Sequence, residues 1–198
     1  LVGSEMCIRD RYPTALCGKF EEKFLSLPKE AIITPMREHQ RYFPVVDEEG
    51  RLLNKFITVR NGGKEFLDVV AHGNERVLRA RLSDAEFFFN EDRKLKLEDR
   101  LEKLKTVSFQ EGLGNMYDKS ERLAKLAEMV KFAINVKVDD TNLKRTALLS
   151  KTDLVAGMVV EFTELQGVMG REYAKLDGEP AEVAEGIYCL LYTSPSPR

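Results

Sequence analysis

The sequence has few of the residues that build metal sites or disulfide frameworks. It contains three cysteines, an odd number, and no pair of them has the Cys-x-x-Cys spacing. Only two histidines, His39 and His72, are present. A structural zinc ion needs about four Cys, His or carboxylate ligands, so we expect no metal site. Reduced thiols are the simpler expectation, as is usual in a cytosolic protein.

Long apolar runs, excess charge and phosphate-binding loops are also missing. No run approaches the ~18 apolar residues of a membrane helix, and the N-terminus has no apolar stretch of signal-peptide length. The 31 Lys and Arg residues nearly balance 33 Asp and Glu residues, for a net charge of −2, which excludes a polybasic arm as the whole basis of function. No glycine-rich loop has Walker or Rossmann spacing, and no Ser/His/Asp or Cys/His set is complete enough for nucleophilic catalysis. We therefore predict no catalytic residues, and no membrane partner.

The 198 residues are 43% apolar, which is enough to build one domain or two small ones. The two ends differ from the rest of the chain. Residues 1–11, LVGSEMCIRDR, and residues 189–198, CLLYTSPSPR, resemble translated sequencing-adapter sequence. We expect both to be non-native tails that are poorly ordered.

Residues 12–72 are predicted to be the end of a mixed α/β domain. Tyr42–Val46 and Leu52–Arg60 are rich in β-forming residues and flank a turn-like segment, so they predict an antiparallel hairpin. Before them we expect a short helix at Thr14–Leu27 and a β-type run at Ala31–Thr34.

From residue 73 to residue 188 the apolar period changes to 3.6, which predicts an all-helical domain. Asp118 and Glu121 have capping-box spacing and predict a helix start. The buried face of that helix is expected to contain Leu123, Leu126, Ala127, Val130 and Ile134. Thr163 and Gln166 form a second such box, and Gly178 with Pro180 marks a helix end followed by a new start. The remaining helices are predicted at 142–150, 153–162, 165–176 and 181–187. The fold class is thus α+β: a small mixed segment with a hairpin, then helices.

The segment MREHQRYFP concentrates two arginines and two aromatic residues before the first hairpin strand. Arg37 and Arg41 can bind phosphates through paired N–H groups, and Tyr42 can stack on a base. The alternative is a solvated loop that enters a strand, with Tyr42 and Phe43 partly in the core. Charge chemistry alone leaves both interpretations open.

A second group of arginines follows the segment HGNER. Arg76 and Arg79 are three residues apart and share a helix face, whereas Arg81 points elsewhere. They are candidates for contact with an RNA phosphate near a helix start. The alternative is an exposed helix face in which they pair with nearby acids, namely Glu75, Asp84 and Glu86.

Two further motifs lie in the helical region. Thr152-Asp153 has threonine where a His-Asp metal phosphohydrolase has its histidine, and both histidines of the chain lie elsewhere. The ligands for metal hydrolysis are therefore too few. Gly167 and Gly170 are three apart in a helical pattern, where glycine costs ~1 kcal/mol relative to alanine. Close approach of another backbone would compensate for this cost.

Three long segments resemble one family. They are MREHQRYFPVVDEEGRLLNKFITVRN, GNERVLRARLSDAEFFFNEDRK and LLSKTDLVAGMVVEFTELQGVMGREYAKLDGEPAEVAEGI. In this order they resemble the beta subunit of bacterial glycyl-tRNA synthetase, the heterotetrameric type. The resemblance covers most of the chain, roughly Glu30 to Ile187.

This resemblance implies an internal fragment that runs from an α/β domain into a degenerate His-Asp-like helical domain. It implies a cytoplasmic α2β2 enzyme, in which the alpha subunit uses ATP, Mg²⁺ and glycine while the beta subunit recognises tRNA(Gly). The implied partners are the alpha subunit, a second beta subunit and tRNA(Gly), with no cofactor in this fragment. We expect the fragment to be non-catalytic by itself and to contact tRNA through Arg37, Arg41, Tyr42, Arg76, Arg79 and Arg81. The alternatives are a purely structural helical scaffold, or a metal-dependent His-Asp phosphohydrolase.

Overall fold

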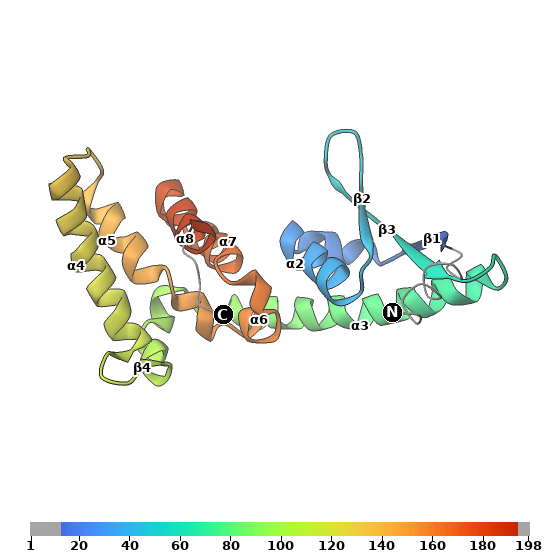
Figure 1. Cartoon of the computed structure of the whole chain (residues 1–198), viewed down its shortest axis with the longest axis horizontal. Coiled ribbons are helices and arrows are strands. Elements are labelled where there is room, and N and C mark those ends of the chain that lie inside the picture. Colours follow the sequence, from blue (N-terminus) through green and yellow to red (C-terminus); the bar gives the residue numbers. More distant parts are fainter. Residues whose placement is uncertain (1–12, 194–198) are drawn as a thin grey trace, which may run out of the picture. The chain divides into compact units, whose positions relative to one another are not determined.

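The computed structural model describes residues 13–193, with side chains as far as Cys189. The chain divides into two compact units between Phe87 and Phe88. The division falls within one long helix, α3 (Leu67–Asp92). Figure 1 shows the larger sheet in the first unit and most of the helices in the second. The expectation of poor order in residues 1–11 and 194–198 concerns residues outside this range, whereas residues 189–193 belong to a helix.

The first unit contains a three-stranded antiparallel sheet with the strand order β1-β3-β2. The predicted hairpin is confirmed, with β2 at Phe43–Val46 and β3 at Leu52–Asn61. The third strand, β1 (Pro13–Lys19), occupies sequence that we expected to be helical, so that prediction was wrong. Alternate residues of β1 are buried along its whole length. This burial period of two residues is that of a strand and not of a helix.

Short helical turns follow β1 and form the core of this unit with the sheet. They are η1 (Glu22–Ser26), α2 (Lys29–Thr34) and a π-helical turn, η2 (Pro35–His39). The β-type run expected at 31–34 is therefore wrong. Its apolar residues are used at helical spacing, because Ile32 and Met36, four residues apart, are both fully buried.

The long helix α3 (Leu67–Asp92) begins before the predicted position and is tied to β1 and η1 by polar contacts. Glu75 accepts a hydrogen bond from the backbone N–H of Lys19 at 2.8 Å. Farther along the helix, Glu86 pairs with Lys23 at 3.1 Å. Together with buried Leu78, these contacts fix the side of α3 that faces the sheet unit.

The second unit is mainly helical, as predicted, with one short two-stranded ladder that we did not expect. Its central helices are α4 (Met116–Ile134) and α5 (Asp140–Leu149), followed by α7 (Val168–Asp177) and α8 (Ala181–Thr193). No helix within residues 13–193 is long and apolar enough to cross a membrane. The shorter elements are η3 (Glu98–Arg100), η4 (Glu102–Thr106), β4 (Ser108–Gln110), β5 (Gly114–Asn115), η5 (Thr152–Val155), α6 (Gly157–Glu161) and η6 (Thr163–Leu165).

Several helix boundaries differ from those predicted. The capping box of α4 joins Asn115 and Asp118, three residues before the expected pair. The box expected at Thr163 does not form, because Gly167, with φ +79°, starts α7 instead. The helix expected at 153–162 is broken at Ala156, which is extended. Gly178 has the left-handed conformation predicted for a helix end.

The buried face predicted for α4 is largely wrong. Leu126 and Val130 are each 53% exposed, and Ile134 is 62% exposed. The helix packs mainly against α5 and η4, and Ala124 is buried there instead. The exposed apolar residues of α4 also include Phe132, at 89% exposure. Periodicity identified the apolar stripe, but not whether a partner covers it.

Candidate nucleic-acid interface

The turn that connects η2 to β2 determines where the first arginine group lies. Arg41 has a left-handed backbone, with φ +57°. The next residue, Tyr42, donates its backbone N–H to the carbonyl oxygen of Met36 at 2.8 Å. A left-handed arginine is uncommon, because its Cβ crowds the backbone. The chain reverses sharply here, which brings Arg37 and Arg41 to the same hollow.

This hollow has a volume of about 250 Å³ and is lined by Arg37, Glu38, Arg41, Tyr42 and Phe43. Both arginines are exposed. Neither forms an ion pair or hydrogen bond with any residue of the described chain, so their N–H groups are available to a ligand. One carboxylate, that of Glu38, reduces the local positive charge without removing it.

Tyr42 lies in the core of the first unit, as the alternative interpretation of this segment expected. Its side chain is 7% exposed and its ring stacks on that of Phe56, with 4.7 Å between centroids and 13° between planes. Burial raises the pKa of its hydroxyl above the ordinary value. The neighbouring Phe43 points outward and is 59% exposed. Phe43, the first residue of β2, is therefore the exposed ring of this pair.

The second arginine group is distributed over different environments along α3. Arg76 is exposed and makes no polar contact within residues 13–193. Arg79 pairs with Glu21 through Nε at 3.0 Å, an acid outside the three that the paired-charge alternative named. Arg81 is half-buried, and its side chain already interacts with another group of the protein. None of the three lines the hollow formed by residues 37–43.

The sequence analysis missed a buried polar centre built on Asp92, at the end of α3. Its Oδ1 accepts hydrogen bonds from Arg100 Nη1 at 3.0 Å and the Gly157 N–H at 2.8 Å. Its Oδ2 accepts from the Met158 N–H and the Tyr173 hydroxyl, each at 2.9 Å. Burial raises the pKa of Tyr173, and the negative charge of Asp92 adds to that shift. This centre joins α3, η3, α6 and α7. No sequence motif predicted it.

A second buried carboxyl is Asp153, at the position of the degenerate His-Asp doublet. Its Oδ2 accepts the N–H of Gly167 at 2.5 Å, while Oδ1 has no partner. Burial raises the pKa of this carboxyl to about 6. Thr152 is also engaged, since its hydroxyl donates to the Leu149 carbonyl oxygen at 2.7 Å. No group of three His, Cys, Asp or Glu side chains within the described range is arranged to hold a metal ion. The doublet position therefore connects backbone segments.

Gly170 lies close to side chains, and not to another backbone as expected for this region. A Cβ there would lie 2.8 Å from a methyl group of Ile187 in α8 and 3.1 Å from Asp153 Oδ2. Glycine is therefore required where α7 passes α8. Gly167 has another role, because its positive φ and its N–H serve the start of α7.

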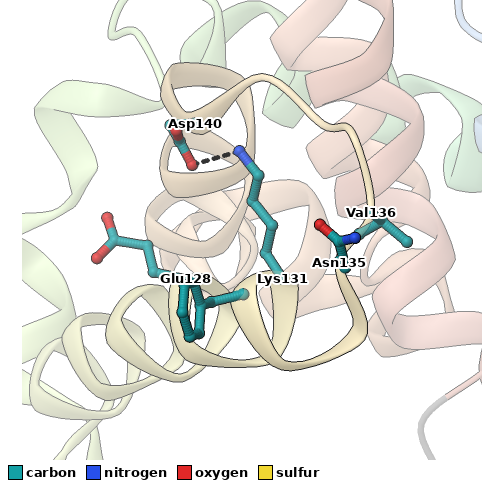
Figure 2. A pocket seen from close by; sticks show the side chains of 6 residues that line it. Glu128, Lys131, Asn135, Val136 and Asp140 are labelled. Atoms are coloured by element: carbon teal, nitrogen blue, oxygen red, sulfur yellow. Dashed lines mark hydrogen bonds and ion pairs between the residues drawn. The ribbon is translucent and has the colours of Figure 1, made fainter.

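A hollow of the second unit lies where α4 turns into α5. Figure 2 shows Lys131 reaching across it to Asp140, with Nζ 2.6 Å from Oδ1. Its volume is about 730 Å³, and Glu128, Phe132, Asn135 and Val136 complete its lining. Because acidic and basic groups are mixed, it has no clear preference for anions.

Comparison with known proteins identifies the family. The family model described as "Glycyl-tRNA synthetase beta subunit" matches residues 7–194. The chain belongs to this family. The glycine–tRNA ligase beta subunits of Syntrophotalea carbinolica, Desulforamulus reducens and Bacillus subtilis are 56%, 53% and 51% identical to it.

The aligned segments cover 93%, 89% and 89% of this chain, but only 27%, 26% and 26% of those three relatives. This chain therefore spans about a quarter of the length of a glycine–tRNA ligase beta subunit, a component of a ligase. The resemblance seen in the three sequence segments is confirmed.

Proposed function

We propose that this segment of the glycine–tRNA ligase beta subunit contributes tRNA binding and subunit scaffolding to the aminoacylation of tRNA(Gly). The observation that supports tRNA binding is the pair of exposed guanidinium groups, Arg37 and Arg41, in one hollow without internal partners. Guanidinium groups bind phosphate oxygens through charge-assisted, paired hydrogen bonds. Arg76 is a third candidate, because it also has no partner within the described residues.

The catalytic step is assigned to the partner subunit in this proposal. The alpha subunit binds ATP, Mg²⁺ and glycine, and two alpha and two beta subunits assemble in the cytoplasm. The second unit is a degenerate His-Asp-like helical domain. Its buried Asp153, held by the Gly167 N–H, supports a structural role, and the segment itself needs no cofactor. Purified chain alone is expected to give no ATP–pyrophosphate exchange, and robust exchange would refute this division of labour.

The salt dependence of tRNA(Gly) binding tests the role of the arginines in the complete ligase carrying this segment. Each phosphate contact contributes ~0.7–0.9 to the slope of log affinity against log salt concentration. Arg37→Ala and Arg41→Asn are each expected to weaken binding and to reduce that slope by about one contact. Asparagine is chosen at position 41 because it tolerates the left-handed backbone.

The matched control is Arg51→Ala. Arg51 is an exposed arginine of the same hairpin, already paired with Asp47 at 2.7 Å and Glu49 at 2.6 Å. Its removal is expected to leave affinity and slope unchanged. Equal slopes for all three variants would remove Arg37 and Arg41 from the tRNA interface.

A purely structural role is the second candidate, and the open apolar side of α4 favours it. Phe132 is 89% exposed and Met129 66% exposed, and side chains of this kind gather where another protein surface packs. Crosslinking of the complete ligase to tRNA distinguishes the two roles. A scaffold gives no crosslinks in residues 13–87, whereas a tRNA-binding surface gives crosslinks near Arg37.

A further inference from the structure

The three-stranded sheet is apolar on both of its faces. In β3, Phe56 and Thr58 point into the core of the first unit, with exposed fractions of 0% and 7%. The residues between and beyond them, Ile57 and Val59, point the other way and are 40% and 50% exposed. β1 has the same alternation, with Leu16 buried.

The strand register collects the outward residues into two adjacent rows. Cys17, Ile57 and Phe43 are direct neighbours across all three strands. Ala15 and Val59 form the next row. We call these five exposed residues the outer apolar face. Lys19 and Lys55, the next outward pair, bound the face at one end with positive charge.

An antiparallel sheet that has one face in water carries polar residues on that face. Here every member of the outer apolar face is aliphatic, aromatic or a thiol, and Phe43 is 59% exposed. A sheet with two apolar faces is normally covered on both, because domains are built from packed layers.

We propose that the outer apolar face is an interface, covered in the intact beta subunit by another layer of the same polypeptide from outside these 198 residues. This rests on family membership. One member of the face, Phe43, also lines the hollow that holds Arg37 and Arg41. The relatives are almost four times as long as the aligned segment, so most of the polypeptide lies outside it. A layer in the same chain is present at high effective concentration. Lys19 and Lys55 further specify that the covering layer presents acidic side chains at that end.

The chemistry of the face favours a protein layer over RNA. None of its five residues carries a charge or a strong hydrogen-bond donor, and four of the five have no flat ring on which a base could stack. The arginines of the first unit that lack partners, Arg37, Arg41 and Arg76, are not among these residues.

Cys17 provides a direct reporter, because its exposed thiol lies in the central row. The rate of N-ethylmaleimide modification of Cys17 is measured by mass spectrometry of its peptide. One sample is the 198-residue chain, and the other is the Bacillus subtilis beta subunit with its matched segment replaced by this sequence. We expect a rate near that of a free peptide thiol in the chain, and a rate at least 100-fold lower in the dilute, isolated subunit.

The other possible occupants give different results. Protection that appears only with the alpha subunit, only with tRNA(Gly), or only at high concentration of the subunit would overturn the proposal. So would a thiol that reacts rapidly in every sample.

Ile57→Lys provides a second measurement, with Glu48→Lys in the β2–β3 loop as the matched control. In the 198-residue chain, both variants are expected to melt within ~2 °C of the parent, because both side chains are exposed. In the complete subunit only Ile57→Lys is expected to lower the melting temperature, by more than 5 °C. Equal melting temperatures for the two variants in the complete subunit would also refute the covering layer.

Discussion

Replacing Asp92 by asparagine is expected to destabilise the second unit far more than an isosteric change at a surface acid. Asp92 is 7% exposed and accepts four hydrogen bonds, two on each oxygen. Its ion pair with Arg100, which is 3% exposed, is likewise buried. An amide has one acceptor oxygen in place of two, and no charge. The variant therefore leaves a buried guanidinium without its counterion and places an NH₂ group opposite buried donors.

The expected loss follows from what remains unpaired. Removing one partner of a buried ion pair costs about 3–5 kcal/mol, because the other charge stays buried without compensation. A folded domain is stable by only about 5–15 kcal/mol, so this loss is a large fraction of the total. At roughly 2–4 °C per kcal/mol for a chain of this size, the melting temperature falls by about 6–20 °C.

Urea unfolding monitored by circular dichroism measures this difference. The control is Glu91→Gln, at the adjacent residue, whose carboxylate pairs with Lys94 at 2.5 Å on the surface and is 46% exposed. A surface pair contributes about 0–1 kcal/mol, so the control is expected to unfold at nearly the parent urea concentration. If Asp92→Asn loses no more free energy than Glu91→Gln, the buried centre does not hold the unit together and the reasoning is wrong.

Three further predictions concern single positions. The pKa of Asp153 is raised to about 6. Between pH 4 and pH 6 the folded state therefore keeps a proton on this carboxyl that the unfolded state releases. The free energy of unfolding falls as the pH rises through this range. Between pH 4 and pH 7 this loss is about 2 kcal/mol relative to Asp153→Asn, measured by urea titration at each pH, and parallel curves for the two proteins would contradict it. Gly170→Ala is expected to cost about 1–3 kcal/mol because its Cβ would lie 2.8 Å from a methyl group of α8, whereas Gly73→Ala, in open space within α3, is expected to stabilise by about 0.5–1 kcal/mol. Calorimetric melting temperatures that shift in the same direction for both glycines would disprove that explanation. Phe132→Lys is expected to change the free energy of unfolding by less than about 0.5 kcal/mol because the ring is 89% exposed, while Leu149→Ala, at a fully buried side chain, is expected to cost about 2–5 kcal/mol. Equal losses in urea for these two variants would show that α4 is covered after all.

The local elements that the sequence predicted correctly have short-range causes. The β2–β3 hairpin follows from two β-rich runs with a turn between them, and the left-handed end of α7 follows from Gly178. The errors have tertiary causes. Ala31 and Ile32 suit a strand in isolation, yet a helix buries them together with Met36. The box expected at Thr163 gives way because the Gly167 N–H binds the distant Asp153.

The candidate site shows the same division. The arginines were identified from their residue type and clustering, but only the fold shows that Arg79 is engaged with Glu21 while Arg37 and Arg41 are available. Tyr42 and Phe43 are adjacent aromatics of similar chemistry. Their roles separate only because the left-handed turn at Arg41 sends one ring onto Phe56 and the other outward.

By itself, the sequence determined the family, the order of a strand-bearing region before a helical one, and the types of side chain available for binding, because these depend on residue identity and short-range periodicity. The tertiary structure alone decided which apolar stripes are covered and which carboxyls are buried. Asp92 meets donors from 65 and 66 residues away, and burial at such separations depends on how distant segments pack. No window of neighbouring residues contains that information, so the open side of α4 and the outer apolar face were visible only in three dimensions.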